Sequence, residues 1–272
     1  MNLQEFSDLV TKEGALHYRD MAWRNTRDPY FILLSEVMLQ QTQVDRVADY
    51  YEKFVRRFPK VNDLAKSSFA EVLSLWSGLG YNRRAKWLQE TAQKIVNDFG
   101  GKVPDTIEEL VALPGIGHNT AAAICVYAFN RSEVFIETNI RTVYIYHLFK
   151  DREEAVKDAE ILKIQGEILD KGVDPRAWYL SLMDYGTFLK KEFGNLSQKS
   201  RSYRKQSTFK GSVRQVRGAL LKLFIQIGNL DSETIDKNLE QYDAGHRKEA
   251  LSQLLDEGFL VKDAKKGYSL KK

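Results

Sequence analysis

The feature that most constrains this chain is a short turn between two segments with helical apolar spacing, Leu113-Pro114-Gly115-Ile116-Gly117-His118-Asn119-Thr120. Pro114 ends the first segment, and the two glycines permit backbone angles and close approach that a Cβ would prevent. The first N–H groups of the second helix have no intrahelical acceptor. Such a turn is suited to bind a phosphate, although Gly and Pro are also common in ordinary helix–helix turns. We predict a helical hairpin over residues 106–128.

The composition is typical of a globular chain long enough for one large or two modest domains, with 43% hydrophobic and 29% charged residues among 272. No apolar run approaches the roughly 18 residues of a membrane span, and the N-terminus does not resemble a signal peptide. The single cysteine, Cys125, excludes a disulfide or a thiolate metal site. We therefore expect a cytoplasmic protein without a membrane partner. The net charge of +4 mildly favours polyanionic partners.

Helical periodicity extends over most of the chain, and no alternating strand pattern precedes residue 255. The segment from about Tyr30 to Gln40 is apolar on most faces, which is typical of a buried helix. An all-α fold follows for this part of the chain. Further helices are predicted at about 61–65, 69–76, 85–99, 154–169 and 175–190.

The composition changes after residue 190, where basic side chains up to Arg217 are opposed by Glu192 alone. We interpret residues 191–211 as a basic linker, which either follows an anionic surface or is merely solvated. Residues 212–272 are predicted to form three helices and two short strands, with a turn at 263–266. This small α+β module resembles a winged helix-turn-helix, a fold that binds DNA about as often as it binds proteins.

Two carboxylates stand out as candidates for chemistry. Glu36 lies within the buried helix, where desolvation raises a carboxyl pKa and favours a general acid, although a hydrogen-bonded core Glu is the simpler alternative. Glu137 follows an apolar run at a helix start, where it could merely complement the helix dipole. An acid paired with an ionised carboxylate is the usual equipment for breaking a glycosidic bond. A carboxylate about 4 Å from the cationic sugar would contribute roughly 4 kcal/mol, about a thousandfold in rate.

The chain resembles the helix-hairpin-helix (HhH-GPD) DNA glycosylases, and among them the MutY-type adenine glycosylases, from Trp23-Arg24 to Asp184-Tyr185-Gly186. The motifs Ser35–Val44, Gly78–Tyr81 and Leu113–Gly117 carry this resemblance. It implies a two-lobed glycosylase domain over residues 1–190, followed by the basic linker and the winged-helix-like module. It also implies a monomer that acts near the nucleoid on double-stranded DNA containing a mismatch.

The resemblance assigns roles to individual residues. Glu36 would protonate adenine at N7, Glu137 would stabilise the oxocarbenium-like state, and Asn139 would position the acids or the attacking water. Gln41 and Tyr81 would wedge into the base stack as the target nucleotide flips out, and Gln41 and Thr42 would touch the opposite base. Gly115 and Gly117 would hold the DNA backbone, with an alkali cation possible on the carbonyls of Leu113 and Gly115. Further DNA contacts are expected at Arg24, Gln40, Arg83, His118, Lys199, Arg201 and Arg204.

Three departures from the family pattern modify these expectations. Strand-cutting relatives carry a Lys where this chain has Asn119, which is no amine nucleophile, so we expect no lyase activity. The second carboxylate is Asp in the family and Glu137 here. The four cysteines that hold an iron–sulfur cluster are absent after Gly186, so we expect no cofactor, and the usual C-terminal reader of oxidised guanine is missing. The favoured activity is excision of adenine opposite 8-oxoguanine or guanine. The alternatives are a T:G mismatch thymine glycosylase and a non-catalytic DNA-binding relative.

Overall fold

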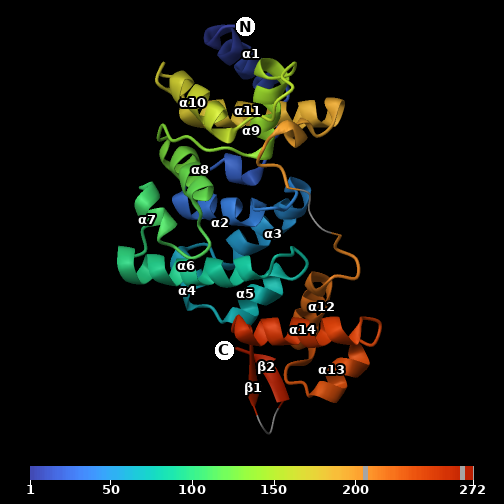
Figure 1. Cartoon of the computed structure of the whole chain (residues 1–272). Helices are drawn as coiled ribbons and strands as arrows, with labels where there is room; N and C mark the ends of the chain where they lie inside the picture. Colours follow the sequence, from blue (N-terminus) through green and yellow to red (C-terminus); the bar gives the residue numbers. More distant parts are fainter. Residues whose placement is uncertain (205–207, 264–266, 272) are drawn as a thin grey trace. The chain divides into compact units, whose positions relative to one another are not determined.

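The computed structural model describes residues 1–204, 208–263 and 267–271, and the predicted fold class is confirmed (Figure 1). Within these ranges the chain is helical except for one small antiparallel sheet near the C-terminus. Most of the turn predicted at 263–266, and part of the predicted linker, lie outside the described residues. The elements are α1 (Leu3–Leu16), η1 (Ala22–Arg24), α2 (Pro29–Leu39), α3 (Val44–Arg57), α4 (Val61–Lys66), α5 (Phe69–Trp76), α6 (Arg83–Phe99), α7 (Ile107–Val111), α8 (His118–Phe129), α9 (Thr138–Leu148), α10 (Asp158–Leu169), α11 (Pro175–Phe193), η2 (Leu196–Lys199), α12 (Val213–Ile227), α13 (Ser232–Asn238), α14 (Ala244–Asp256), β1 (Leu260–Asp263) and β2 (Gly267–Leu270).

Two compact units make up the fold, and each is assembled from two separate stretches of chain. Unit 1 comprises Met1–Glu36 and Val103–Lys205, and unit 2 comprises Val37–Lys102 and Gln206–Lys272. The first crossing from unit 1 to unit 2 occurs inside the continuous helix α2. The boundaries predicted at 190/191 and 211/212 follow the order of the chain, whereas the units depend on which distant segments pack together.

The core of unit 1 forms where α1, α9 and α11 pack together. The ring of Phe6 lies 5.0 Å from that of Tyr144 and 6.1 Å from that of Trp178, both with edge-on geometry that aromatic pairs prefer. Gly186 of α11 lies so close to the backbone of Asn139 in α9 that a Cβ would overlap the carbonyl group. The absence of a side chain at Gly186 therefore allows this close helix–helix contact.

The helix predicted at 154–169 begins later than expected, at Asp158. The preceding residues instead pair with the chain near η2, where the Val156 amide donates to the Lys199 carbonyl and the Arg201 amide donates to the Val156 carbonyl, both at 3.0 Å. These two hydrogen bonds form a parallel bridge, and Val156 is buried within it. A tertiary contact 44 residues away along the chain thus overrides the local helical pattern, and it attaches the start of the basic run to unit 1.

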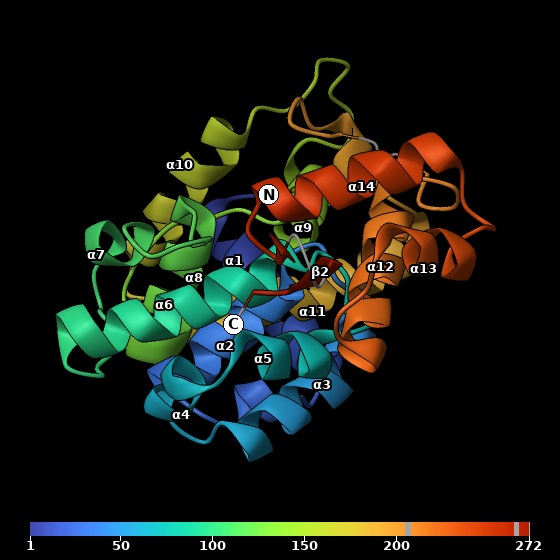
Figure 2. The same ribbon diagram turned by 90° about the horizontal axis from the view of Figure 1, so that it is seen from below.

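Unit 2 brings α3, α4, α5 and α6 together with the C-terminal module (Figure 2). Phe54 packs edge-on against Trp76, at 5.8 Å between ring centroids. In the module, α12 packs against α14, and β1 pairs with β2 in the register Leu260 to Leu270. Phe259 places its ring 5.5 Å from that of Phe69 in α5, so the module shares an apolar core with the rest of the unit. Among the described residues, no helix is long and apolar enough to cross a membrane.

Candidate active site

The predicted hairpin is present, and its two glycines differ in conformation. Gly115 has φ +73°, a left-handed backbone that favours glycine. Gly117 has φ −87° and ψ 170° at the N-cap of α8, an extended conformation open to any residue. The prediction that both glycines supply unusual backbone angles is therefore wrong for Gly117. A Cβ at Gly117 would meet nothing within 4 Å, so the lack of a side chain here serves only to leave the surface open at the N-terminus of α8. The hairpin helices α7 and α8 are green in Figure 1.

The first residues of α8 face solvent and also fix the hairpin to the neighbouring segment. His118 and Asn119 are both exposed. The side-chain amide of Asn119 donates a 3.0 Å hydrogen bond to the carbonyl of Ile136, the residue before Glu137. Asn119 thus connects the hairpin to the segment that leads to Glu137, the candidate second carboxylate.

Glu36 is partly buried on α2 and has the properties of a general acid. The pKa of its carboxyl is raised from 4.5 to about 8. Burial is the largest cause, the negative charge of Glu137 adds to it, and the positive charge of Arg24 opposes both. A carboxyl with this pKa is largely protonated at neutral pH. The structure therefore brings Glu36 and Glu137 into one electrostatic environment within unit 1.

Glu137 occupies the N-cap of α9, but its side chain makes no capping hydrogen bond. Burial raises the pKa of this carboxyl too, and the Arg141 guanidinium lowers it. Arg141 is in turn held by Asp158 through contacts of 2.8 and 2.7 Å. Burial raises the pKa of the Tyr127 hydroxyl, and the charges of Glu36 and Glu137 add to this effect. Tyr127 thus belongs to the same site, although nothing in the sequence pattern distinguishes it from other apolar positions of the helix.

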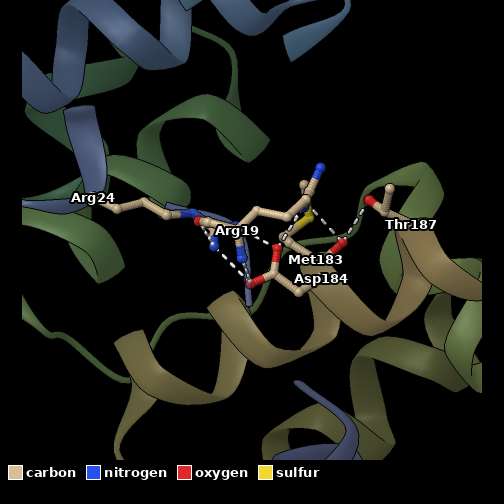
Figure 3. Close-up of polar contacts among 5 residues, drawn as sticks. All are labelled: Arg19, Arg24, Met183, Asp184 and Thr187. Atoms are coloured by element: carbon tan, nitrogen blue, oxygen red, sulfur yellow. Dashed lines mark hydrogen bonds and ion pairs between the residues drawn. The ribbon is translucent and has the colours of Figure 1, made fainter. Parts of the chain in front are cut away.

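Arg24 was expected to contact DNA, but its side chain is only 5% exposed. Its two terminal nitrogens donate to the carboxylate of Asp184 at 2.6 and 2.9 Å, and Arg19 adds a third contact at 2.6 Å (Figure 3). We correct the interpretation of Arg24 accordingly. Its charge acts inside the protein, near Glu36, and is neutralised by the buried carboxylate of Asp184.

The segment leading to Glu137 is held by residues that sequence reasoning did not identify. The Tyr179 hydroxyl accepts from the Phe135 amide at 3.2 Å, and the Gln165 side chain donates to the Phe135 carbonyl at 2.9 Å. Arg176 donates to the carbonyls of Tyr127, Arg24 and Thr26. These buried polar side chains come from α10 and α11, far away in sequence, and only the tertiary fold brings them to the site.

The two predicted wedge residues lie in unit 2, and both have a left-handed backbone unusual for residues with a side chain. Gln41 has φ 54° and Tyr81 has φ 50°. Both are exposed. Such strained positions often occur at functional sites.

Arg84 joins the two loops that carry Gln41 and Tyr81, residues 40–43 and 77–82, which we call the wedge loops. Nothing in the sequence suggested this role. Its guanidinium donates to the carbonyls of Val37 and Met38 at 2.8 Å, to the Thr42 hydroxyl at 2.8 Å and to the Gly80 carbonyl at 3.2 Å. It also lies 5.2 Å from the Trp76 ring centroid. Several acceptors and an aromatic face suit the planar, multidentate guanidinium. Arg84 therefore fixes the end of α2 and both loops together.

The remaining predicted DNA contacts are at the surface. Gln40 and Thr42 are partly buried, and Arg83 is exposed but forms an ion pair with Glu257 at 2.5 Å. Burial raises the pKa of Glu257, but hydrogen bonds from Arg217 and Arg83 outweigh it and lower the pKa to about 2. Lys199, Arg201 and Arg204 of the basic run are exposed.

The iron–sulfur cluster common in related enzymes has no set of ligands in this chain. The single cysteine, Cys125, is buried in α8 among apolar residues, and four thiolates are required. Among the described residues, no group of three or more His, Cys, Asp or Glu side chains could hold a metal ion. The residues present do not fit the cluster.

Sequences and solved structures similar to this chain belong to DNA repair proteins. Residues 34–167, which include both carboxylates, the wedge loops and the hairpin, match the model of the HhH-GPD superfamily of base excision DNA repair proteins. The matched segment is just under half of this chain. It is 42% identical over 127 residues to an adenine DNA glycosylase of Buchnera aphidicola subsp. Baizongia pistaciae, covering 47% of this chain and 36% of that protein. A mouse adenine DNA glycosylase is 46% identical over 134 residues, covering 46% of this chain and 26% of that protein.

This chain spans well under half the length of these relatives. A longer match, 27% identical over 266 residues, covers 89% of this chain and 73% of an adenine DNA glycosylase from Buchnera aphidicola subsp. Schizaphis graminum. Among solved structures, a thermostable thymine-DNA glycosylase superposes with a TM-score of 0.61 at 26% identity, covering 74% of this chain and 96% of that one. An endonuclease III–DNA complex, at TM-score 0.54 and 18% identity, shares the fold.

Proposed function

We propose that this protein is a monofunctional DNA glycosylase of base excision repair that hydrolyses the N-glycosidic bond of adenine mispaired with 8-oxoguanine or guanine. The observation that carries this proposal is the pair of partly buried carboxyls, Glu36 and Glu137, in a segment that matches the HhH-GPD model. Two acids in one apolar setting titrate at different pH values, so one can be protonated while the other is ionised. The adenine DNA glycosylases among the relatives support the choice of base.

In the proposed reaction, Glu36 donates its proton to N7 of adenine, which makes the base a neutral leaving group. The C1′–N9 bond then breaks, and the ionised Glu137 stabilises the positive charge that develops on the sugar. A water molecule, which Asn139 helps to position, adds at C1′ and passes a proton to the carboxylate of Glu36, which restores the acid for the next turnover. Asn119 offers no amine for a Schiff base, so the reaction ends at the abasic site.

DNA is the proposed partner, and contacts in both units would hold it. The hairpin residues Gly115, Gly117 and His118 would bind the phosphate backbone, with an alkali cation on the Leu113 and Gly115 carbonyls. Gln41 and Tyr81 would fill the space left by the flipped nucleotide, which offsets a few kcal/mol of lost stacking. The exposed side chains of Lys199, Arg201 and Arg204 would add charge-dependent affinity. The protein would act as a monomer and without an iron–sulfur cluster.

An excision assay tests the proposal directly. Duplexes containing A opposite 8-oxoguanine, A opposite G, and T opposite G are incubated with the protein, and hot alkali then cleaves the strand at any abasic site. We expect cleavage of the adenine-containing strand only after alkali, and its loss in Glu36→Gln. Binding to all three duplexes with no abasic site in any of them would contradict enzymatic function and leave a DNA-binding protein.

Thymine excision from T:G mismatches is the second candidate, because the solved thymine-DNA glycosylase has the same fold at 26% identity. The acid is the discriminating residue. Protonation of N7 makes adenine leave, whereas thymine has no N7, so a thymine glycosylase would not depend on Glu36 in this way. Cleavage of the T:G duplex by both the wild type and Glu36→Gln would favour this second function.

A further inference from the structure

Unit 2 contains a large groove between the wedge loops and the C-terminal module. Its volume is about 1220 Å³, more than a small-molecule pocket requires. One side is formed by the loops at 40–43 and 77–84 with the start of α3, and the other by α12. All of its lining residues belong to unit 2 and to the described part of the chain.

The charge of the groove is strongly positive. Its lining includes six cationic side chains and one carboxylate, that of Glu257. Glu257 is already bound to Arg83 and Arg217, at 2.5 and 2.6 Å, so it does not neutralise the others. Arg46 on α3 and Lys222 on α12 are exposed on opposite sides of the groove. The charge complements a polyanion that lies between the two walls.

Aromatic rings lie among these cations. Tyr81 and Trp87 line the groove from the loop and α6, Phe209 lines it from the end of the linker, and Tyr242 lines it from the module. Phe209 is 59% exposed, a high value for a phenylalanine. The cations on the two walls can bind the phosphates of a nucleic-acid strand, and the exposed rings offer apolar surface against which its sugars and bases can pack.

The module is fixed in this position by specific contacts. The ion pair of Glu257 with Arg83 joins the module to α6. Lys86 of α6 donates to the Glu257 backbone carbonyl, and Phe259 packs on Phe69 of α5. A groove wall that is anchored by buried contacts can contribute a defined binding surface rather than a loose tether.

We propose that this groove binds the DNA strand opposite the target nucleotide, and that α12 of the C-terminal module supplies one of its walls. The inference rests on the proposed function and deepens it. Gln41 and Thr42, which are expected to touch the opposite base, line the groove, while the acids and the hairpin that serve the target strand belong to unit 1.

The first experiment measures the salt dependence of binding. The double variant Arg46→Ala/Lys222→Ala removes one cation from each wall, and Arg56→Ala/Lys237→Ala removes an exposed Arg of α3 and an exposed Lys of the module outside the groove. With a duplex containing A opposite 8-oxoguanine, we expect the groove variant to lose about two units of the slope of log affinity against log salt. The control pair should leave the slope unchanged. Equal slopes in the two variants would overturn the proposal.

The second experiment identifies the strand. The only native cysteine, Cys125, is fully buried, so Lys222→Cys provides a single accessible thiol. We expect disulfide cross-linking to a thiol tether on a phosphate of the opposite strand and not to the same tether on the target strand. Cross-linking to the target strand alone, or to both strands equally, would overturn the proposal. Both readouts are binding measurements, so an absence of base excision would contradict the proposed function without deciding the role of the groove.

Discussion

Glu36 and Glu137 must hold different protonation states for the proposed chemistry, and this determines the pH dependence. Glu36 must be protonated, and its pKa is about 8, so the single-turnover rate of base removal should fall roughly tenfold per pH unit above that pH. Glu137 must be ionised, and its pKa is raised, so the rate should also fall on the acid side, at a pH above the usual range of a Glu. Rates measured under saturating enzyme from pH 4.5 to 9.5 check this bell shape. A rate that is constant up to pH 9.5 would contradict the role of Glu36.

Asp184 should influence the same profile through Arg24. The charged or titratable groups that face Glu36 are Glu137, Arg24 and Tyr127. In Asp184→Asn the Arg24 charge is no longer offset, which stabilises ionised Glu36 and should move the basic limb to lower pH by about one unit. Asp158→Asn provides the contrast, because it releases Arg141 beside Glu137 and should move the acidic limb instead. An identical shift in both variants would argue against separate roles for the two acids.

Glu36 should also reduce the stability of the folded protein at neutral pH. Its folded-state pKa of about 8 exceeds the ordinary 4.5, so stability is lost as the pH rises through this interval, by about 3 kcal/mol at pH 7. Glu36→Gln should therefore unfold at a higher urea concentration at pH 7, and the gain should vanish near pH 4.5. Glu108→Gln, on an exposed position of α7, is the matched control and should change neither value. A less stable Glu36→Gln at pH 7 would contradict the raised pKa.

At the residue scale, the sequence was informative where a residue contrasts with its neighbours. A carboxylate inside an apolar helix, or glycines in a short turn, can be recognised in the sequence alone. Tyr127 and Arg84 could not be, since an aromatic residue or an arginine in a helix is unremarkable until its neighbours in space are known. Arg24 was misinterpreted for the same reason, because its partner Asp184 is 160 residues away.

The packing of α11 on α9 is the element-scale feature that supports Asn139. Gly186→Ala would place a methyl group against the Asn139 backbone, so we expect a loss of about 1–3 kcal/mol in stability together with a lower rate of base removal. Gly14→Ala is a matched control, because its methyl group would overlap Ser181 where α1 packs on α11, away from the acids. It should reduce stability to a similar degree and leave the rate per folded molecule unchanged. Thermal unfolding and single-turnover rates separate the two effects.

Helix positions were largely predictable because apolar periodicity reflects burial, and the C-terminal helices and hairpin were expected from their turns. The start of α10 was not, because it depends on the bridge between Val156 and Ser200. The conformation of Gly117 could not be read from its residue type either, since glycine also adopts extended angles. Local pattern thus predicts which segments are helical, and long-range contacts decide where they end.

At the scale of the whole molecule, unit 2 needs the C-terminal module for its core. A chain ending at Arg204 would lose the contact of Phe259 with Phe69 and expose the apolar surface of α5, which costs roughly 2 kcal/mol for one large side chain alone. We expect a clearly lower melting temperature by circular dichroism than for the full chain. Glu257→Gln, which removes only the ion pairs with Arg83 and Arg217, should have a smaller effect. An unchanged melting temperature in the truncated chain would contradict the proposed dependence of unit 2 on the module.

Helix α2 has a mechanical consequence. It carries Glu36 near its C-terminal end and leads directly into Gln40–Thr42, and Arg84 clamps its last carbonyls to the loop at Gly80. A helix is stiff along its axis. If the loop that carries Gln41 moves when it enters a base stack, α2 would therefore move with it, and the carboxyl of Glu36 would be displaced as well. Insertion of Gln41 at the mismatch and placement of the Glu36 proton would then occur together. The substitution Val37→Pro, which interrupts α2 between these two residues, should leave mismatch binding intact and abolish base removal.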